Sequence, residues 1–244
     1  MMIKGLFFDV GGTLYSYSRY PDVMLSVCQQ VRERHSLGLS AEELVPRLME
    51  ATKAADVKFT ERSFYLFQHY FEEICRQFFA KIELSSPAEE ISWCSNLMEN
   101  GLVTQLELKP DCHQTLASLK AQGLYTSVVS NSDIHQLDTL IERGNLAEYF
   151  DHITSSEAAA SCKPDKGFFE VALNKSGLDP EQVLFIGDSL EQDIAGAKSV
   201  GIKTVLITEE GMITPMHIGG EAVEPDFRIT ELSELLTLVG ENNN

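Results

Sequence analysis

The chain has 244 residues, of which 43% are hydrophobic, and a formal net charge of −18 at pH 7. This is enough apolar material for one large or two small domains, while the negative charge argues against nucleic acid or an anionic membrane as a partner. No apolar stretch approaches the roughly 20 residues that span a bilayer, and no secretory leader precedes Ile3. The five cysteines form no Cys-x-x-Cys pair, as is typical of a reducing compartment. We expect a cytoplasmic protein, either a monomer or a homodimer.

The first element is an apolar run that reaches from Ile3 to Phe8 and is followed by Asp9. Such a run is typical of a strand that is buried on both faces. In an open α/β sheet, ligands bind beyond the carboxyl ends of the strands, so Asp9 is the first candidate for chemistry. The alternative is a strand that ends in a turn, where Asp and Gly are common without any function.

Between Leu14 and Pro110 the sequence predicts helices and no strand. The expected helices are Pro21–His35, one that follows the capping box of Ser40 and Glu43, one that carries the apolar stripe Phe64, Phe67, Phe71, Ile74 and Phe78, and Pro87–Glu99, which Gly101 closes. This region is therefore expected to be an all-helical insert. The phenylalanine stripe is expected to pack inside the insert rather than to face a ligand, because such stripes usually point inward.

From Pro110 onward, strand and helix signals alternate at the spacing of βα units, which predicts a parallel sheet. The predicted strands are Tyr125–Ser130, Phe150–Thr154, Val183–Gly187, Lys203–Ile207 and Asp226–Ile229. The predicted helices Asp111–Gln122 and Ser189–Val200 are each followed by a glycine, Gly123 and Gly201, which commonly ends a helix.

Polar residues recur at the ends of these later segments. Ser130 ends one predicted strand, Lys163 precedes a predicted helix start, and Asp188 and Asp193 follow another strand in a Gly-Asp-x-x-x-x-Asp pattern. Together with Asp9, this order of Asp, Ser, Lys and Asp resembles the four motifs of the haloacid dehalogenase superfamily. The resemblance extends from Ile3 to about Val239.

The resemblance implies an α/β fold with a Rossmann-like parallel sheet core and an inserted α-helical cap domain. The core would comprise residues 1–15 and 106–240, and the cap would comprise residues 16–105. In the superfamily, an insert at this place closes over the active site.

The resemblance also implies a Mg²⁺-dependent phosphatase that acts on a small phosphorylated metabolite. A carboxylate nucleophile forms an acyl phosphate that is itself easily hydrolysed, and a hard divalent ion bound by oxygen atoms neutralises the charge that would repel the phosphate. The implied roles are Asp9 as the nucleophile, Asp9, Asp188 and the Gly11 carbonyl as Mg²⁺ ligands, and Ser130 and Asn131 with the adjacent N–H groups as phosphate ligands. Lys163 would lie between phosphate and Asp9, and Asp193 would orient Lys163 or a metal-bound water.

One position departs from the family pattern. Phosphatases of the superfamily carry a general acid and base Asp two residues after the nucleophile, and this chain has Gly11 there. Glycine keeps the carbonyl ligand but loses the proton donor and base, whose contribution is about 10²–10⁴-fold in rate. We therefore expect aryl phosphates to be cleaved faster than sugar phosphates, and Gly11→Asp to raise turnover of alkyl phosphates.

Other activities remain open at this point. Dehalogenases of the superfamily also replace the second Asp, but they need no metal and lack the Gly187-Asp188 pattern. Phosphonoacetaldehyde hydrolases use a cap lysine to form an imine, for which Lys53 and Lys58 are candidates. A third alternative is a phosphate-binding or interaction module that kept the fold without catalysis. Substrate specificity would lie in the cap and in the segment Tyr15–Tyr20, where three tyrosines and Arg19 could line the mouth of the site.

Overall fold

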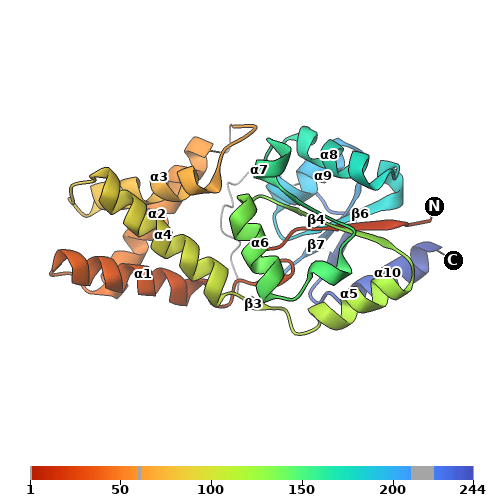
Figure 1. The fold of residues 1–244 in the computed structure, drawn as a ribbon, viewed down its shortest axis with the longest axis horizontal. Coiled ribbons are helices and arrows are strands. Elements are labelled where there is room, and N and C mark those ends of the chain that lie inside the picture. Colours follow the sequence, from red (N-terminus) through yellow and green to blue (C-terminus); the bar gives the residue numbers. More distant parts are fainter. Residues whose placement is uncertain (1, 60–61, 210–222, 244) are drawn as a thin grey trace.

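The structure is a computed structural model that describes residues 2–59, 62–209 and 223–243. This part of the chain forms a parallel sheet covered by helices, and a group of four helices that lies beyond one edge of the sheet (Figure 1). The predicted α/β fold with a Rossmann-like parallel sheet is confirmed.

The sheet has six parallel strands in the order β5-β4-β1-β6-β7-β8. The strands are β1 (Gly5–Phe8), β4 (Tyr125–Ser130), β5 (His152–Ser155), β6 (Val183–Gly187), β7 (Lys203–Ile207) and β8 (Phe227–Ile229). Phe8 is in register with Val128 of β4 and with Ile186 of β6. The residues that follow β1, β4 and β6 therefore meet at one edge of the sheet.

Side chains of β1 alternate between the two faces of the sheet. Leu6 and Phe8 pack with residues of α5 (Cys112–Ala121), α6 (Ile134–Arg143) and α10 (Glu234–Asn243). Phe7 packs on the other face with residues of α8 (Lys166–Ser176) and α9 (Gly196–Ser199). Burial of both faces explains why the strand sequences are continuously apolar.

The remaining helices are α1 (Tyr20–His35), α2 (Ala41–Phe59), α3 (Phe67–Lys81), α4 (Ala88–Gln105) and the short α7 (Ser156–Ala159). None of the described helices is long and apolar enough to cross a membrane. All five cysteines are buried and free, as expected from the sequence.

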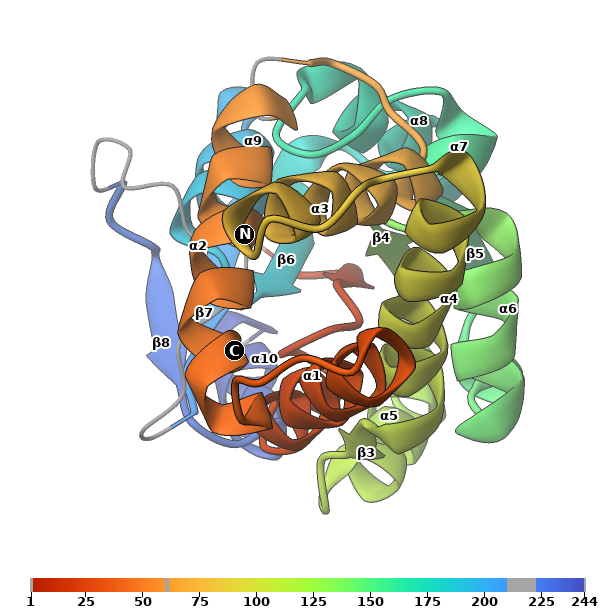
Figure 2. The ribbon, with the colours of Figure 1, turned by 90° about the vertical axis from the view of Figure 1, so that its left-hand side faces the viewer.

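Helices α1 to α4, here called the helical unit, have a hydrophobic core of their own. Val27, Leu48 and Phe78 belong to this core, which is separate from the two clusters that cover the sheet. Figure 2 shows the helical unit in front of the edge at which β1, β4 and β6 end. The division into a core of residues 1–15 and 106–240 and a cap of residues 16–105 stays a prediction.

The prediction that no strand lies between Leu14 and Pro110 was wrong. Strands β2 (Tyr15–Ser16) and β3 (Glu107–Leu108) form an antiparallel ribbon where the chain enters and leaves the helical unit. Each strand has only two residues, and each pairs with a partner about ninety residues away, so neither gives a local signal. The ribbon fixes the start of the segment that follows β2.

Two further details of the helical unit differ from the prediction. Helix α4 continues through Gly101 to Gln105. The missing side chain of Gly101 leaves room for Val23, whose Cγ1 would lie 2.5 Å from a Cβ at that position. Phe64 precedes α3 and is 39% exposed, whereas Ile74 and Phe78 are buried as expected.

The helical unit is tied to the rest of the chain near the start of α3. The carboxylate of Asp133 accepts hydrogen bonds from the backbone N–H groups of Phe67 at 2.7 Å and Gln68 at 2.9 Å, where helix α3 has unpaired donors. The backbone N–H of Cys162 donates to the carbonyl of Ser63 at 2.7 Å. These contacts place the start of α3 beside the loop that follows β4 and the loop between α7 and α8.

Candidate active site

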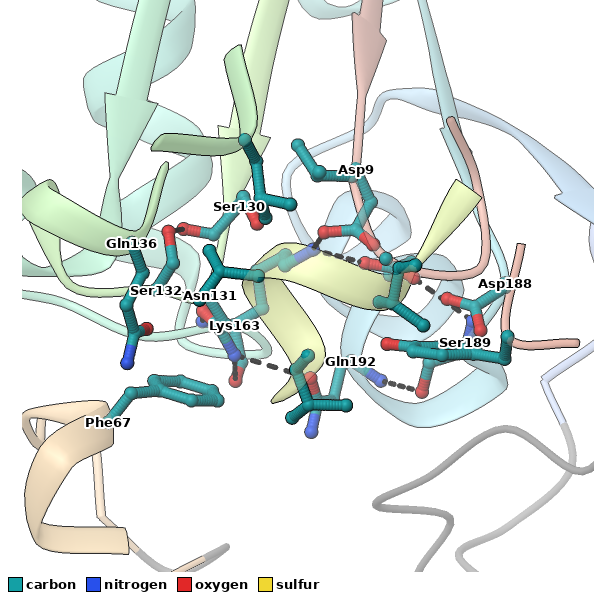
Figure 3. Close-up of a pocket in the computed structure, with 18 of the residues that line it drawn as sticks. Asp9, Phe67, Ser130, Asn131, Ser132, Gln136, Lys163, Asp188, Ser189 and Gln192 are labelled. Atoms are coloured by element: carbon teal, nitrogen blue, oxygen red, sulfur yellow. Dashed lines mark hydrogen bonds and ion pairs between the residues drawn. The ribbon is translucent and has the colours of Figure 1, made fainter. Parts of the chain in front are cut away.

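Three of the predicted site residues are brought together by neighbouring strands. Asp9 follows β1, and its backbone N–H donates to the Ile186 carbonyl at 2.9 Å, which continues the pairing of β1 with β6. Ser130 is the last residue of β4, and Asp188 directly follows β6. All three line a single cavity between the sheet edge and the helical unit (Figure 3).

Lys163 joins this group from the loop between α7 and α8. Its Nζ lies 2.6 Å from Oδ1 of Asp9 and 2.6 Å from Oδ1 of Asp193, and the lysine side chain is 2% exposed. Burial alone would lower the pKa of Lys163, but the negative charges of Asp193 and Asp9 raise it above its usual value. The ammonium group is therefore a fixed positive charge beside the proposed nucleophile.

Asp193 holds Lys163 from a short π-helical turn, Leu190–Ala195. Its Oδ2 accepts a hydrogen bond from the Ser189 N–H at 3.0 Å, while its Oδ1 faces the lysine. A Cβ on Gly187 would lie 2.3 Å from Cγ of Asp193, so only glycine allows this carboxylate to approach the strand end. This close approach gives a physical reason for the Gly-Asp-x-x-x-x-Asp spacing.

The Asn131 side chain supports the lysine loop. Its Oδ1 accepts from the Lys163 N–H at 2.7 Å, and its Nδ2 donates to the Lys163 carbonyl at 3.0 Å and to Gln192 Oε1 at 3.2 Å. The predicted phosphate ligand Asn131 thus lies in the site, with its carboxamide engaged in positioning the Lys163 backbone.

Burial sets the electrostatics of Asp9. Removal from water raises the pKa of Asp9 to about 6, the charge of Lys163 acts in the opposite direction, and the charge of Asp193 adds to the increase. Asp9 shares this edge of the sheet with two further aspartates, Asp188 and Asp193, and with Lys163.

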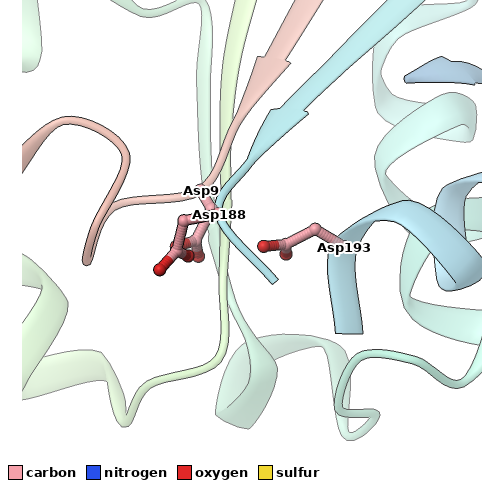
Figure 4. Close-up of side chains that lie close together, drawn as sticks. All are labelled: Asp9, Asp188 and Asp193. Atoms are coloured by element: carbon pink, nitrogen blue, oxygen red, sulfur yellow. The ribbon is translucent and has the colours of Figure 1, made fainter. Parts of the chain in front are cut away.

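The carboxylates fit a divalent cation. Oxygen atoms of Asp9, Asp188 and Asp193 lie within 4.8 Å of one another. In Figure 4 the carboxylates of Asp9 and Asp188 lie side by side, and that of Asp193 points toward them from the other side. Among the described residues, Lys163 is the one cationic side chain that lines the cavity. Hard oxygen ligands and uncompensated negative charge are what Mg²⁺ prefers.

The far wall of the cavity is largely apolar and includes the start of the phenylalanine stripe. Phe67 and Phe71 of α3 line the cavity as well as packing within the helical unit. The other apolar residues of this wall are Leu102, Val103, Leu106 and Leu140. The stripe therefore divides along its length, with its first turn facing the site and its later turns in the core.

Gln136 is one of the cavity residues that were not identified from the sequence, and Tyr17 was identified only within a group. Gln136 lies on α6 and is buried, and its Nε2 has no hydrogen-bond partner in the part of the chain that the structure describes. Tyr17 was one of four candidates at the mouth of the site, and it alone of Tyr15, Tyr17, Arg19 and Tyr20 lines the cavity. No local pattern singles out either residue, since both positions depend on how distant segments pack.

The two candidate imine-forming lysines lie away from the cavity. Lys53 is exposed on α2, and Lys58 pairs with Glu73 at 2.9 Å. Neither residue lines the cavity. Their positions do not support an imine with a substrate in this cavity.

Comparisons with known proteins identify relatives over almost the whole chain. Glyceraldehyde 3-phosphate phosphatase from Pyrococcus furiosus is 26% identical over 242 residues, which is 99% of this chain and 95% of that protein. A HAD hydrolase from Bacillus subtilis, solved with magnesium bound, has a TM-score of 0.77 at 18% identity, covering 98% of this chain and 99% of that one. L-2-haloacid dehalogenase from Xanthobacter autotrophicus has a TM-score of 0.71 at 22% identity, covering 98% and 99%. At these identities the two structures show a shared fold. The family model for haloacid dehalogenase-like hydrolases matches residues 3–201, and the chain therefore belongs to that family.

Proposed function

We propose that this hydrolase is a Mg²⁺-dependent phosphatase that acts on a small phosphorylated metabolite through an aspartyl phosphate on Asp9. The observation that carries the proposal is the buried Asp9–Lys163–Asp193 group beside Asp188 and Ser130 at one edge of the sheet. The name of the glyceraldehyde 3-phosphate phosphatase relative supports the same substrate class.

We propose for these residues the roles that the family motifs imply, and their charges and positions support them. Asp9 would attack phosphorus, and Lys163 would hold Asp9 and the phosphoryl group together. Ser130 and the neighbouring N–H groups would bind phosphoryl oxygens. Asp9, Asp188 and the Gly11 carbonyl would hold Mg²⁺, which when bound offsets the repulsion between a phosphate dianion and the carboxylates. Asp193 would keep Lys163 in place.

The size of the cavity favours a small substrate. It encloses about 140 Å³, which is below the range of roughly 300–1,000 Å³ that is usual for sites of drug-sized ligands. Its apolar wall and the Nε2 donor of Gln136 would contact the part of the substrate that carries the phosphate. We propose that the helical unit acts as the cap that encloses this part.

Asp9→Asn is expected to abolish phosphate release from every ester in a panel of sugar, glycerol and aryl phosphates assayed with Mg²⁺. The amide keeps the shape of the side chain but is not a nucleophile. Asp138 is an exposed aspartate on α6, so Asp138→Asn is the matched control and should retain full activity. Retained phosphate release in Asp9→Asn would disprove the aspartyl-phosphate mechanism. Chloride release from 2-chloropropionate without metal, in a protein that cleaves no phosphate ester, would make it a dehalogenase.

Mg²⁺ is expected to raise the melting temperature of the wild-type protein and to leave that of Asp188→Asn unchanged. A ligand that binds only the folded state stabilises it by about 2.7 kcal/mol at one hundred times its dissociation constant. Asp188→Asn removes a ligand charge with little change in shape. Thermal unfolding with and without Mg²⁺ measures the effect, with Asp138→Asn again as the control. An equal Mg²⁺ shift in Asp188→Asn would rule out Asp188 as a metal ligand.

A further inference from the structure

The side chain of Tyr17 occupies the space beside Gly11. A Cβ built on Gly11 would lie 2.4 Å from the Tyr17 hydroxyl oxygen and 3.0 Å from Cζ, so the phenol stands where a longer side chain at position 11 would have to extend. The ring also covers the next residue, with Cε2 at 2.8 Å from a Cβ on Gly12. The two glycines therefore make room for this tyrosine.

The β2–β3 ribbon holds Tyr17 in that place. Tyr17 directly follows β2, and β2 pairs with β3 through Tyr15 and Ser16. The Ser16 hydroxyl donates to Glu209 Oε1 at 2.6 Å, and the Tyr17 carbonyl accepts from the Tyr20 N–H at 2.8 Å. Hydrogen bonds thus hold both the residue before Tyr17 and the Tyr17 carbonyl, so an ordered segment presents the phenol to the cavity.

The hydroxyl faces the acidic side of the cavity. Tyr17 lines the same cavity as Asp9 and Asp188. A tyrosine hydroxyl ordinarily carries its proton at neutral pH and can donate a hydrogen bond.

Cleavage of a phosphate ester at Asp9 needs a donor at the bridging oxygen. The phosphorus–oxygen bond breaks with both electrons going to that oxygen, while phosphorus bonds to the Asp9 carboxylate. The developing negative charge is large for an alkoxide and small for a nitrophenolate. A fixed donor placed where charge develops is one of the largest contributions an enzyme site makes.

We propose that the Tyr17 hydroxyl is a catalytic hydrogen-bond donor to the leaving oxygen of the substrate. It holds the place that Gly11 leaves free and retains its own proton throughout, and solvent water supplies the proton that completes the alcohol. The inference rests on the proposed phosphatase function, and it makes Tyr17 a residue that discriminates between leaving groups.

The test is Tyr17→Phe, which keeps the ring and removes the hydroxyl. Phosphate release is measured with Mg²⁺ on nitrophenyl, chlorophenyl and phenyl phosphates and on glyceraldehyde 3-phosphate. We expect kcat/KM to fall by about 10²-fold for the alkyl ester, the effect of losing one such donor, and by less than about tenfold for nitrophenyl phosphate, whose leaving group carries little charge. The plot of log kcat/KM against leaving-group pKa should become steeper.

Tyr20→Phe is the matched control. The ring of Tyr20 meets that of Tyr17 edge to face, with 6.1 Å between the ring centroids, but Tyr20 does not line the cavity. The plot of log kcat/KM against leaving-group pKa for Tyr20→Phe should therefore have the slope of wild type. An unchanged or parallel plot for Tyr17→Phe, in a protein that still requires Asp9, would overturn the role of Tyr17 and leave the phosphatase function intact. Activity that is absent in wild type or independent of Asp9 would overturn both.

Discussion

Lys163→Met is expected to abolish turnover and to lower the free energy of unfolding by about 3–5 kcal/mol at pH 8, which is the usual cost of breaking a buried ion pair by removing one partner. Lys163 Nζ is bonded to Asp9 and Asp193, whose side chains are 10% and 2% exposed. Methionine fills a similar volume, so the loss reports the missing charge. Denaturant unfolding without metal measures it.

The cost of this substitution should shrink as the pH falls. The pKa of Asp9 is raised to about 6 by burial even with Lys163 present, and removing the lysine removes the charge that holds this pKa down. A carboxyl group whose pKa is higher in the folded state than in the unfolded state binds a proton on folding, so stability is lost as the pH rises through the folded pKa. Lys163→Met should therefore be closer to wild type at pH 5 than at pH 8.

The control for Lys163→Met is Lys53→Met, because Lys53 is exposed on α2. The free energy of unfolding of Lys53→Met should stay within about 0.5 kcal/mol of wild type. An equal loss for Lys163→Met at pH 5 and pH 8 would mean that the loss does not come from an unpaired Asp9. A loss as small as that of Lys53→Met would mean that the lysine is not part of a buried charge group.

In contrast to the expectation from the sequence, Gly11→Asp alone is expected to give no gain in alkyl phosphatase turnover. Gly11→Asp combined with Tyr17→Ala should exceed Tyr17→Ala alone by up to about 10²–10⁴-fold, the range of general acid–base catalysis. The added side chain cannot coexist with the Tyr17 hydroxyl, which would lie 2.4 Å from its Cβ. Removing the phenol opens the space that the carboxylate needs. The measurement is kcat for glyceraldehyde 3-phosphate with Mg²⁺.

The backbone at Gly11 does not oppose the substitution. The left-handed residue of this turn is Gly12, with a φ of +72°, and a Cβ on Gly12 would lie 2.1 Å from Asp188 Oδ2. Position 12 thus requires glycine, while position 11 is limited by one side chain. If Gly11→Asp alone gained as much as the double variant, Tyr17 would not control this space.

The sequence was sufficient to predict the residues that parallel strands deliver to one edge. Asp9, Ser130 and Asp188 each follow a recognisable apolar run, and neighbouring parallel strands end at the same side of a sheet. Lys163 was identified by motif order, because the loop that carries it has no signal of its own. The close approach of Asp193 to Gly187 explains the spacing but was not predictable from it.

The residues that the sequence did not single out for the site depend on contacts between distant parts of the chain. Tyr17 is placed by a ribbon of two-residue strands, which is too short to give a periodic pattern. Gln136 faces the cavity only because α6 lies beside the helical unit. Phe67 and Phe71 have the helical spacing of core residues, and they also line the cavity. Spacing alone does not distinguish a residue that packs in a core from one that also borders a cavity.

The bond between the Cys162 N–H and the Ser63 carbonyl lies one residue from Lys163. A displacement of the helical unit from the sheet would therefore act on the backbone that carries the lysine. Asn131 bonds both the N–H and the carbonyl of Lys163 and so opposes a shift of that backbone. A substitution in the 63–65 segment is therefore expected to disturb the position of Lys163, although that segment does not line the cavity.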